Sequence, residues 1–298
     1  MTLSLACPVC GRESWSFAPA LNWGEWRRCT SCELEFVEPM RLTEAPETLY
    51  DGAYRGIRKQ NAMEEFSLRV SQRRTIITEP SLWFWTPAFK TVLDWLQHRL
   101  PAGATVLEVG CGLGFLLHEL RNRGFQASGV DIAEAAVELN RNDGFEVWHG
   151  TVKSLPANWL TQADAVLAFF MLHHLEDPIG LLTEIKSRWP NAPVAIAQYG
   201  PSNRDPERSA PPRTLTRWGA KSLEAACARA GYRSTVMSFP SSGAEHPAFK
   251  PLTALFRHTT RFPRIFRFAR RVQRKVLPNV VPTLRVDDYV VLALAEPN

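Results

Sequence analysis

The chain has 298 residues, of which 45% are hydrophobic and 22% are charged, proportions typical of a folded globular protein rather than a disordered one. The longest apolar run, 165–172, is far shorter than the roughly 20 residues that a membrane-spanning helix needs. The first residues, MTLSLAC, lack the charged start and the apolar stretch of a signal peptide, so a cytoplasmic location is expected.

The net charge of +5 comes from one segment. Residues 246–286 hold ten basic residues and no acidic one, whereas the rest of the chain holds 25 basic and 30 acidic residues. Within this segment, 257–277 predicts a basic amphipathic helix. Three interpretations stay open: a helix packed on its own domain, a peripheral contact with an anionic membrane at its inner face, or a grip on the phosphates of a nucleotide sugar or RNA.

Four of the six cysteines form two close pairs near the start of the chain. They are Cys7, Cys10, Cys29 and Cys32. Each pair can bind one ion from a single turn, and two such turns complete a tetrahedral site with no open position. The spacing therefore predicts a structural Zn²⁺ ribbon over 1–45, with short strands at 14–17 and 25–28; unmetallated turns or a redox dithiol are the alternatives. Few apolar residues lie in 1–45, so folding there should depend on the metal.

Residues 46–104 are predicted to be a linker followed by a helical cover. Apolar residues at helical spacing predict a helix over 61–79. The stretch 81–95 is rich in tryptophan and phenylalanine. It is interpreted as a helix that buries aromatic rings on the neighbouring domain, or as one wall of a substrate pocket.

From residue 105 onward, short β-branched runs alternate with amphipathic segments. Strands are predicted at 105–109, 126–130, 146–149, 163–169 and 194–198, with helices at 115–123, 133–142 and 178–188. This alternation is typical of a parallel sheet covered by helices on both faces, so the fold class is α/β and Rossmann-like. In such sheets the ligand lies at the carboxyl edge of the strands.

The loop after the first of these strands carries the strongest functional signal. Three glycines at alternate positions, Gly110, Gly112 and Gly114, let the backbone bend and approach a ligand closely. Glu108 precedes them, and Asp131 ends the next strand, where an acid can accept both hydroxyls of a ribose.

This loop resembles motif one of the class I S-adenosylmethionine-dependent methyltransferases, and the resemblance extends over about 100–298. It implies a seven-stranded sheet whose last strand, 288–295, is antiparallel, in a domain spanning 105–298 with 246–286 as an insertion. It also implies S-adenosylmethionine as cofactor and the following binding residues: Glu108, Gly110, Cys111, Gly112, Gly114, Asp131, Ile132, Thr151 and Val152. Thr151 stands where the family usually has an aspartate.

The cysteine ribbon, together with Tyr50 and Tyr54 behind it, resembles a bacterial subgroup of these methyltransferases that acts in sugar, surface-glycan or natural-product pathways. The resemblance implies a small-molecule or glycan-precursor substrate. The less favoured alternative is an RNA methyltransferase whose ribbon and basic helix hold RNA. A cofactor-binding scaffold without turnover is the third hypothesis.

His173 and His174 follow the fourth strand on the ligand edge and are the first candidates for the catalytic base. Related enzymes often carry Pro-Pro-Glu-His-Leu before the helix that leads to strand six, whereas this chain has Arg213 and Thr214 in place of Glu and His. If that histidine is the family's base, then His173 or His174 replaces it, the acceptor needs no base, or the chain is inactive.

Overall fold

The computed structural model describes residues 6–18, 25–41, 45–55, 70, 73–78, 87–200, 214–240 and 289–298. The basic segment 246–286, most of the predicted helix 61–79, and Arg213 lie outside the described residues. In the described part of 61–79, residues 73–78 are helical, as predicted. Within the described ranges, no helix is long and apolar enough to cross a membrane.

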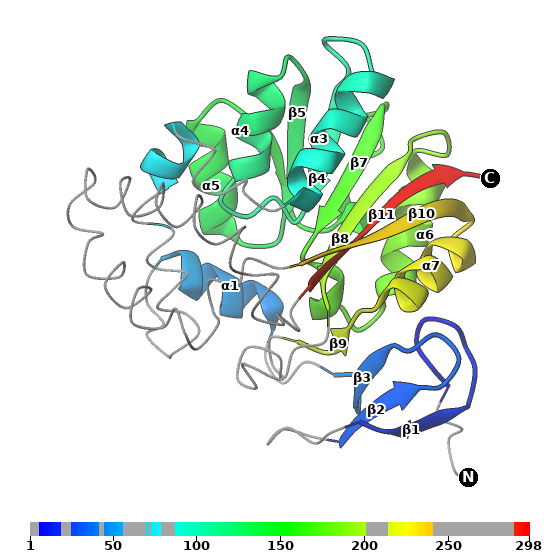
Figure 1. Cartoon of the computed structure of the whole chain (residues 1–298). Helices are drawn as coiled ribbons and strands as arrows, with labels where there is room; N and C mark the ends of the chain where they lie inside the picture. The colour runs from blue at the N-terminus through cyan, green and yellow to red at the C-terminus, as the bar shows by residue number, and fades with distance from the viewer. Residues whose placement is uncertain are drawn as a thin grey trace.

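Seven strands form the larger sheet, in the order β10-β11-β8-β7-β4-β5-β6 (Figure 1). They are β4 (Thr105–Val109), β5 (Gln126–Asp131), β6 (Glu146–His149), β7 (Ala165–Phe169), β8 (Val194–Tyr199), β10 (Tyr232–Pro240) and β11 (Tyr289–Pro297). Strands β8, β7, β4, β5 and β6 run parallel, and β11 is antiparallel to both of its neighbours. The predicted α/β sheet with an antiparallel last strand is confirmed.

Helices cover both faces of this sheet. They are α3 (Pro87–Arg99), α4 (Phe115–Asn122), α5 (Glu134–Asn142), α6 (Pro178–Arg188) and α7 (Ala220–Arg229), whereas α1 (Pro46–Tyr54) packs beside α5. Side chains alternate between the faces along a strand: in β4, Val106 packs in the cluster under α3 and α4, whereas Leu107 packs in the cluster under α6 and α7. Both strand faces are buried, which explains the nearly continuous apolar sequence of β7.

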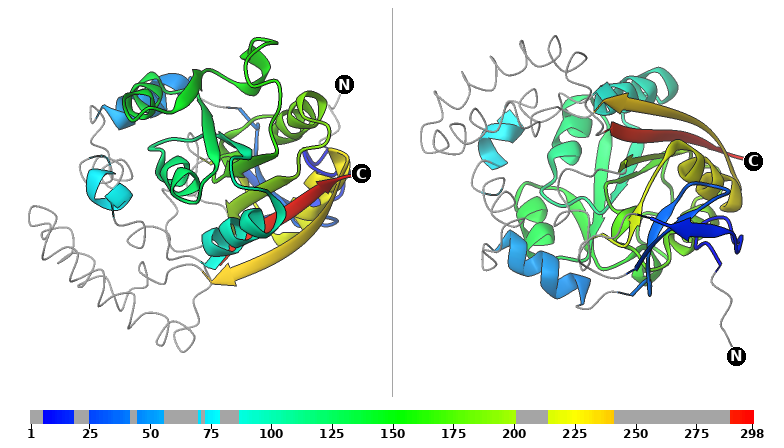
Figure 2. Two further views of the ribbon diagram at one scale, coloured as in Figure 1. Left: turned by 90° about the horizontal axis from the view of Figure 1, so that it is seen from above. Right: turned by 60° about the horizontal axis from the view of Figure 1, so that its bottom comes forward.

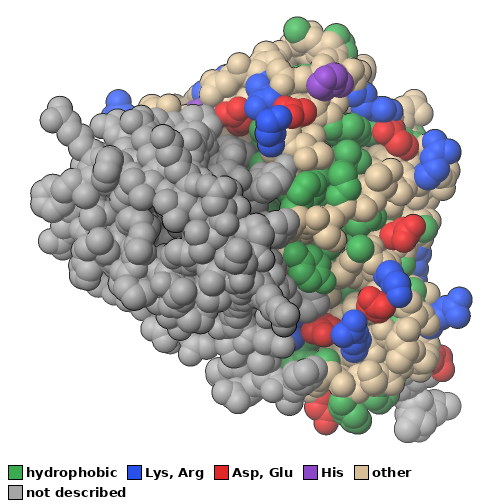
Figure 3. Space-filling model, in the orientation of Figure 1, with side chains coloured by type: hydrophobic (Ala, Val, Ile, Leu, Met, Phe, Trp, Pro, Cys, Tyr) green, Lys and Arg blue, Asp and Glu red, His purple; other side chains and the backbone are tan. Residues whose placement is uncertain are grey.

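The described part of the aromatic stretch 81–95 belongs to α3, which covers the sheet. Phe89 is buried and its ring meets that of Phe169 edge-on, with centroids 5.4 Å apart. In Figure 3, apolar side chains gather over α3 and the neighbouring β10 and β11. An open hollow of about 790 Å³ lies there, and Trp95, Met237 and Leu294 are among its lining residues. The glycine loop is not part of that lining, so this hollow is separate from the loop.

The cysteine ribbon forms a second sheet, in the order β1-β2-β3-β9. Its strands are β1 (Trp15–Phe17), β2 (Glu25–Cys29), β3 (Glu35–Glu38) and β9 (Thr216–Arg217). The first two were predicted, but β3 and β9 were not, and β9 lies far downstream of the other three strands in the sequence. The ribbon lies beside α7 (Figure 2), where Arg229 donates to the carbonyl of Val9 at 2.9 Å. The ribbon and the large sheet therefore share one packed core.

Candidate active site

The chain leaves β4 through three glycines whose backbone lies in the left-handed region. The angle φ is 75° at Gly110, 50° at Gly112 and 72° at Gly114, values that other residues rarely adopt. Gly114 is also the N-cap of α4. Strand β4 lies between β5 and β7, where the order of the parallel strands reverses. Ligands of open α/β sheets bind at this point, outside the carboxyl ends of the strands.

The side chain of Asn140 in α5 binds the backbone of the glycine loop. Its side chain is fully buried, and its Nδ2 donates to the carbonyl of Gly112 at 2.8 Å and to that of Ala136 at 2.9 Å. A Cβ added at Gly114 would lie only 1.8 Å from Asn140 Oδ1. Glycine is therefore required at 114 both for its backbone conformation and for the space that it leaves.

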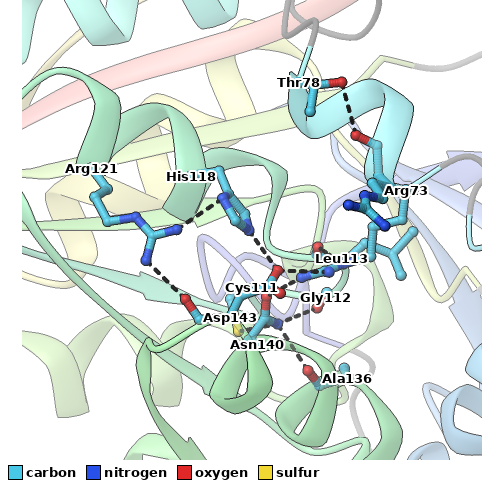
Figure 4. Close-up of polar contacts among 11 residues, drawn as sticks. Arg73, Thr78, Cys111, Gly112, Leu113, His118, Arg121, Ala136, Asn140 and Asp143 are labelled. Carbon is cyan, nitrogen blue, oxygen red and sulfur yellow. Dashed lines mark hydrogen bonds and ion pairs between the residues drawn. The ribbon is translucent and has the colours of Figure 1, made fainter.

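Arg73, which lies upstream in the sequence, also binds the glycine loop (Figure 4). Its Nε donates to the carbonyl of Leu113 at 2.8 Å, and one terminal nitrogen donates to Asn140 Oδ1 at 3.1 Å. The other pairs with Asp143 at 2.7 Å. The carboxylate of Asp143 also accepts from His118 Nε2 at 2.7 Å. The sequence reasoning missed both Arg73 and Asn140, because neither belongs to a motif.

Two acids end neighbouring strands beside the loop. Asp131 Oδ2 accepts from the N–H of Gly112 at 2.8 Å, and its Oδ1 accepts from the N–H of Ala133 at 2.9 Å. Burial raises the pKa of Asp131, and these backbone N–H groups oppose that rise. Because each carboxylate oxygen has two lone-pair sites, Asp131 retains capacity for a ligand.

Glu108 is the second acid, and it is only 6% exposed. Its Oε2 is buried and has no hydrogen-bond partner among the described residues. Burial, together with the nearby charge of Asp131, raises the pKa of Glu108 well above its usual value. A buried carboxyl oxygen needs a donor, and a ligand bound at this edge of the sheet would supply one to Glu108.

Helix α1 lies beside α5 (Figures 1 and 2), and its last residue, Tyr54, contacts the glycine loop. Asp51 Oδ1 accepts from the N–H of Ala135 at 2.8 Å, in the first turn of α5, so the two helices are joined. The Cβ of any residue at 112 would lie 2.7 Å from the hydroxyl of Tyr54. Tyr54 therefore touches the glycine loop at Gly112, a contact that the sequence reasoning did not anticipate.

The other predicted cofactor residues lie around the same edge. The carbonyl of Ile132 accepts from His149 Nε2 at 3.1 Å. Thr151 caps the short 3₁₀ helix η2 (Val152–Ser154), because its hydroxyl accepts from the N–H of Ser154 at 3.3 Å. Val152 and Cys111 are buried. The position of these residues is compatible with a bound nucleoside, but the hydroxyl of Thr151 already serves the cap.

The two histidines form a 3₁₀ turn, η3 (Leu172–His174), immediately after β7. His173 Nδ1 donates to Gln198 Oε1 at 2.8 Å. Gln198 is the penultimate residue of β8, is fully buried, and its Nε2 has no partner among the described residues. The ring of His174 meets Tyr50 of α1 edge-on at 5.2 Å. The turn is close to the glycine loop, since Met171 Cβ would lie 3.2 Å from a Cβ built on Gly110.

An aromatic pair flanks this turn. Phe170 has φ = 54°, a genuine outlier for a bulky residue. Its ring stacks on Tyr199 with centroids 4.2 Å apart, and Tyr199 is 50% exposed. Strained residues persist where the surrounding structure holds them, often beside functional sites. The pair provides an exposed aromatic surface at the edge where the histidines lie.

The four paired cysteines lie together in the ribbon, and their predicted clustering is confirmed. All four Sγ atoms are within 4.8 Å of one another. Cys7 and Cys32 are 3.6 Å apart, and Cys10 and Cys29 are 3.5 Å apart. Thiolates bound to Zn²⁺ at about 2.3 Å in a tetrahedron would be about 3.8 Å apart. The donor set and its spacing fit a four-thiolate metal ion.

Comparisons with known proteins agree with this geometry. Residues 84–235 match a family model described as "Methyltransferase domain". Two curated relatives, each named "Ubiquinone biosynthesis O-methyltransferase", come from Stutzerimonas stutzeri and Xanthomonas axonopodis pv. citri. They are 31% and 35% identical to this chain over 97 residues. That stretch is 30% of this chain and only 42% and 41% of the relatives' length.

Among solved structures, the MccD protein matches with a TM-score of 0.52 and 14% identity, over 72% of this chain and 99% of that one. At this identity the likeness concerns the fold alone. The sheet order with its antiparallel last strand, the glycine loop and the family match over half of the sequence agree. The chain belongs to the methyltransferase domain family.

Proposed function

We propose that this protein transfers a methyl group from S-adenosylmethionine to a small-molecule acceptor, such as a sugar or a glycan precursor. The observation that carries the proposal is the left-handed glycine loop between two buried acids, one of which has an unpartnered oxygen. The names of the curated relatives support a small-molecule acceptor, although the chain spans less than half of their length.

The residues at the strand edge fit the cofactor. The glycines at 110, 112 and 114 would let its methionyl part pass close to the backbone. Glu108 would accept from the cationic amino group, which would favour its ionised form. Asp131 would accept from the ribose hydroxyls with its remaining lone pairs. Ile132 would pack on the adenine.

S-adenosylmethionine supplies an electrophilic methyl group, and the protein must align an acceptor with it and remove the acceptor's proton. His173 is the candidate base that would take this proton from the acceptor. Its Nδ1–H is donated to Gln198, so in the neutral ring the lone pair is on Nε2. His174 and Tyr50 would help to close the site, because their rings pack together between η3 and α1.

We also propose that the ribbon binds Zn²⁺ in a purely structural role. Four thiolates leave no coordination position for water or substrate, so the ion would fold the ribbon and take no part in transfer. The placement of Cys29 and Cys32 in the shared core supports this role, since both are buried.

The first experiment incubates the purified protein with methyl-labelled S-adenosylmethionine and a cell extract, and then separates RNA, protein, lipid or envelope glycan, and small molecules. Label in the glycan, lipid or small-molecule fraction is expected. Label in RNA would replace the proposal with an RNA methyltransferase. Cofactor binding without any labelled product would indicate a scaffold without turnover.

A further inference from the structure

One residue joins the ribbon to the histidine turn. The N–H of Leu215 donates to the carbonyl of His173 at 2.8 Å, and the carbonyl of Leu215 accepts from the N–H of Val37 at 3.0 Å. Val37 belongs to β3 of the ribbon, and Leu215 immediately precedes β9. Leu215 is fully buried. Leu215 therefore links the backbone of His173 to β3 of the cysteine ribbon through two backbone hydrogen bonds.

A buried ion pair fixes the register of this junction. In the β3–β9 ladder, Glu35 lies opposite Arg217. The Arg217 guanidinium is 3.0 Å from the Glu35 carboxylate and 3.9 Å from the ring centre of Trp26, and all three side chains are buried. A guanidinium held between a carboxylate and an aromatic face has one favourable position. A slip of β9 along β3 would separate the buried Arg217 guanidinium from the Glu35 carboxylate, which is costly.

The ribbon has a second attachment that does not touch the histidine turn. Arg229, at the end of α7, donates to the carbonyl of Val9 at 2.9 Å. Lys221, at the start of α7, pairs with Glu33 at 2.7 Å, and both of these side chains are well exposed. Loss of the α7 contacts would weaken the docking of the ribbon without changing β9. The molecule thus contains a matched control for the junction.

We propose that the ribbon is a positioning element for the transfer reaction: β3, through β9 and Leu215, holds the His173 turn in place while leaving the cofactor site unaffected. This inference rests on the proposed function, in which His173 removes the acceptor's proton. Glu35, Arg217 and Leu215 are positioning residues, since they act through the turn and touch neither cofactor nor acceptor.

The test compares a double variant, Glu35→Gln with Arg217→Met, with the control Arg229→Ala. The double variant removes both charges, so no buried charge is left unpaired. Three quantities are measured in each protein: the side-chain ¹⁵N shifts of His173, the dissociation constant for S-adenosylhomocysteine, and the rate of methyl transfer to the labelled fraction. The seven histidines are assigned with the help of a His173→Gln variant.

In the double variant the His173 shifts should change and transfer should fall about tenfold, because small displacements of a catalytic group are costly. The affinity for S-adenosylhomocysteine should stay within about twofold, and Arg229→Ala should leave the His173 shifts as in the wild type. A folded double variant with wild-type His173 shifts would overturn the proposal. An inactive wild type would refute the proposed function alone, since the shifts still report on the turn.

Native-state hydrogen exchange tests the same link without any substitution. If the ribbon holds the turn, the amides of Val37 and Leu215 should exchange through one common opening, with similar free energies. The proposal fails if Val37 exchanges through openings of much lower free energy while Leu215 remains protected with β7. This measurement decides the matter even if the double variant does not fold.

Discussion

The two halves of the candidate site are held in different ways. The glycine loop is fastened by Asp131 and Asn140, which follow it within 30 residues, and by Arg73 from upstream. The histidine turn is fastened by Gln198, by Leu215 and, through Leu215, by Val37 from the other end of the sequence. Both halves have direct partners within about 42 residues, but only the histidine turn is also joined, through Leu215, to the cysteine ribbon. The two halves should therefore respond differently to the same perturbation.

Removal of the metal should produce the largest difference between the glycine loop and the histidine turn. In isolated zinc fingers the metal contributes roughly 10–16 kcal/mol of apparent binding free energy to folding, so chelation under reducing conditions should open the ribbon. Hydrogen–deuterium exchange should rise in β1, β2 and β3 and also in β9, while β4 and β5 stay protected. The control Cys227→Ala removes a buried thiol outside the cluster and should preserve the metal. Unchanged protection of β9 in an opened ribbon would contradict the coupling.

Asp131→Ala should damage only the cofactor half. Hydrogen bonds to a charged group are worth about 1.5–3 kcal/mol each, and the loss of two of them to the ribose corresponds to a loss of about 10²- to 10⁴-fold in affinity for S-adenosylhomocysteine. Titration calorimetry measures this loss. Asp94→Ala on α3, which removes an acid paired with Lys90, should bind normally. If Asp131→Ala binds like the wild type, the cofactor site lies elsewhere.

Gly114→Ala probes how tightly the loop is packed. Gly103 and Gly114 both have positive φ, but a Cβ at 103 meets nothing within 4 Å, whereas one at 114 collides with Asn140. Gly103→Ala should therefore cost only the backbone strain, about 1 kcal/mol. Gly114→Ala should lower the free energy of unfolding by about 2 kcal/mol more than Gly103→Ala does, because Asn140 must move and break its buried hydrogen bonds. Urea unfolding gives both values, and equal losses would show that the Asn140 contact is unimportant.

Glu108→Gln should change how stability depends on pH. The folded-state pKa of Glu108 is raised above its usual value of 4.5 by burial and by Asp131, so the folded protein binds this proton more tightly than the unfolded chain does. Wild-type stability should therefore fall as pH rises from about 4.5 through the raised pKa, by about 1.4 kcal/mol for each unit of difference. In Glu108→Gln this part of the decline should vanish. If the unfolding free energies of the wild type and of Glu108→Gln follow parallel curves with pH, the prediction is wrong.

The sequence predicted most of the large sheet correctly, because its strands are apolar, short and separated by amphipathic helices. It also predicted that Cys7, Cys10, Cys29 and Cys32 would lie together, since their spacing alone specifies two metal-binding turns. The glycine loop was found for a similar reason: Gly110, Gly112 and Gly114 are needed for a local backbone path. Such features depend on neighbours in the chain.

What only the tertiary structure decided concerns residues without a motif. Strand β9 is two residues long, and nothing in its own sequence marks it as a strand; it forms because β3 offers it a partner and Glu35 offers its Arg217 a charge. Arg73 and Asn140 likewise read as ordinary helix residues. Their roles arise from hydrogen bonds to groups 28 to 67 positions away, and such pairings are fixed only when the layers of the fold close on one another.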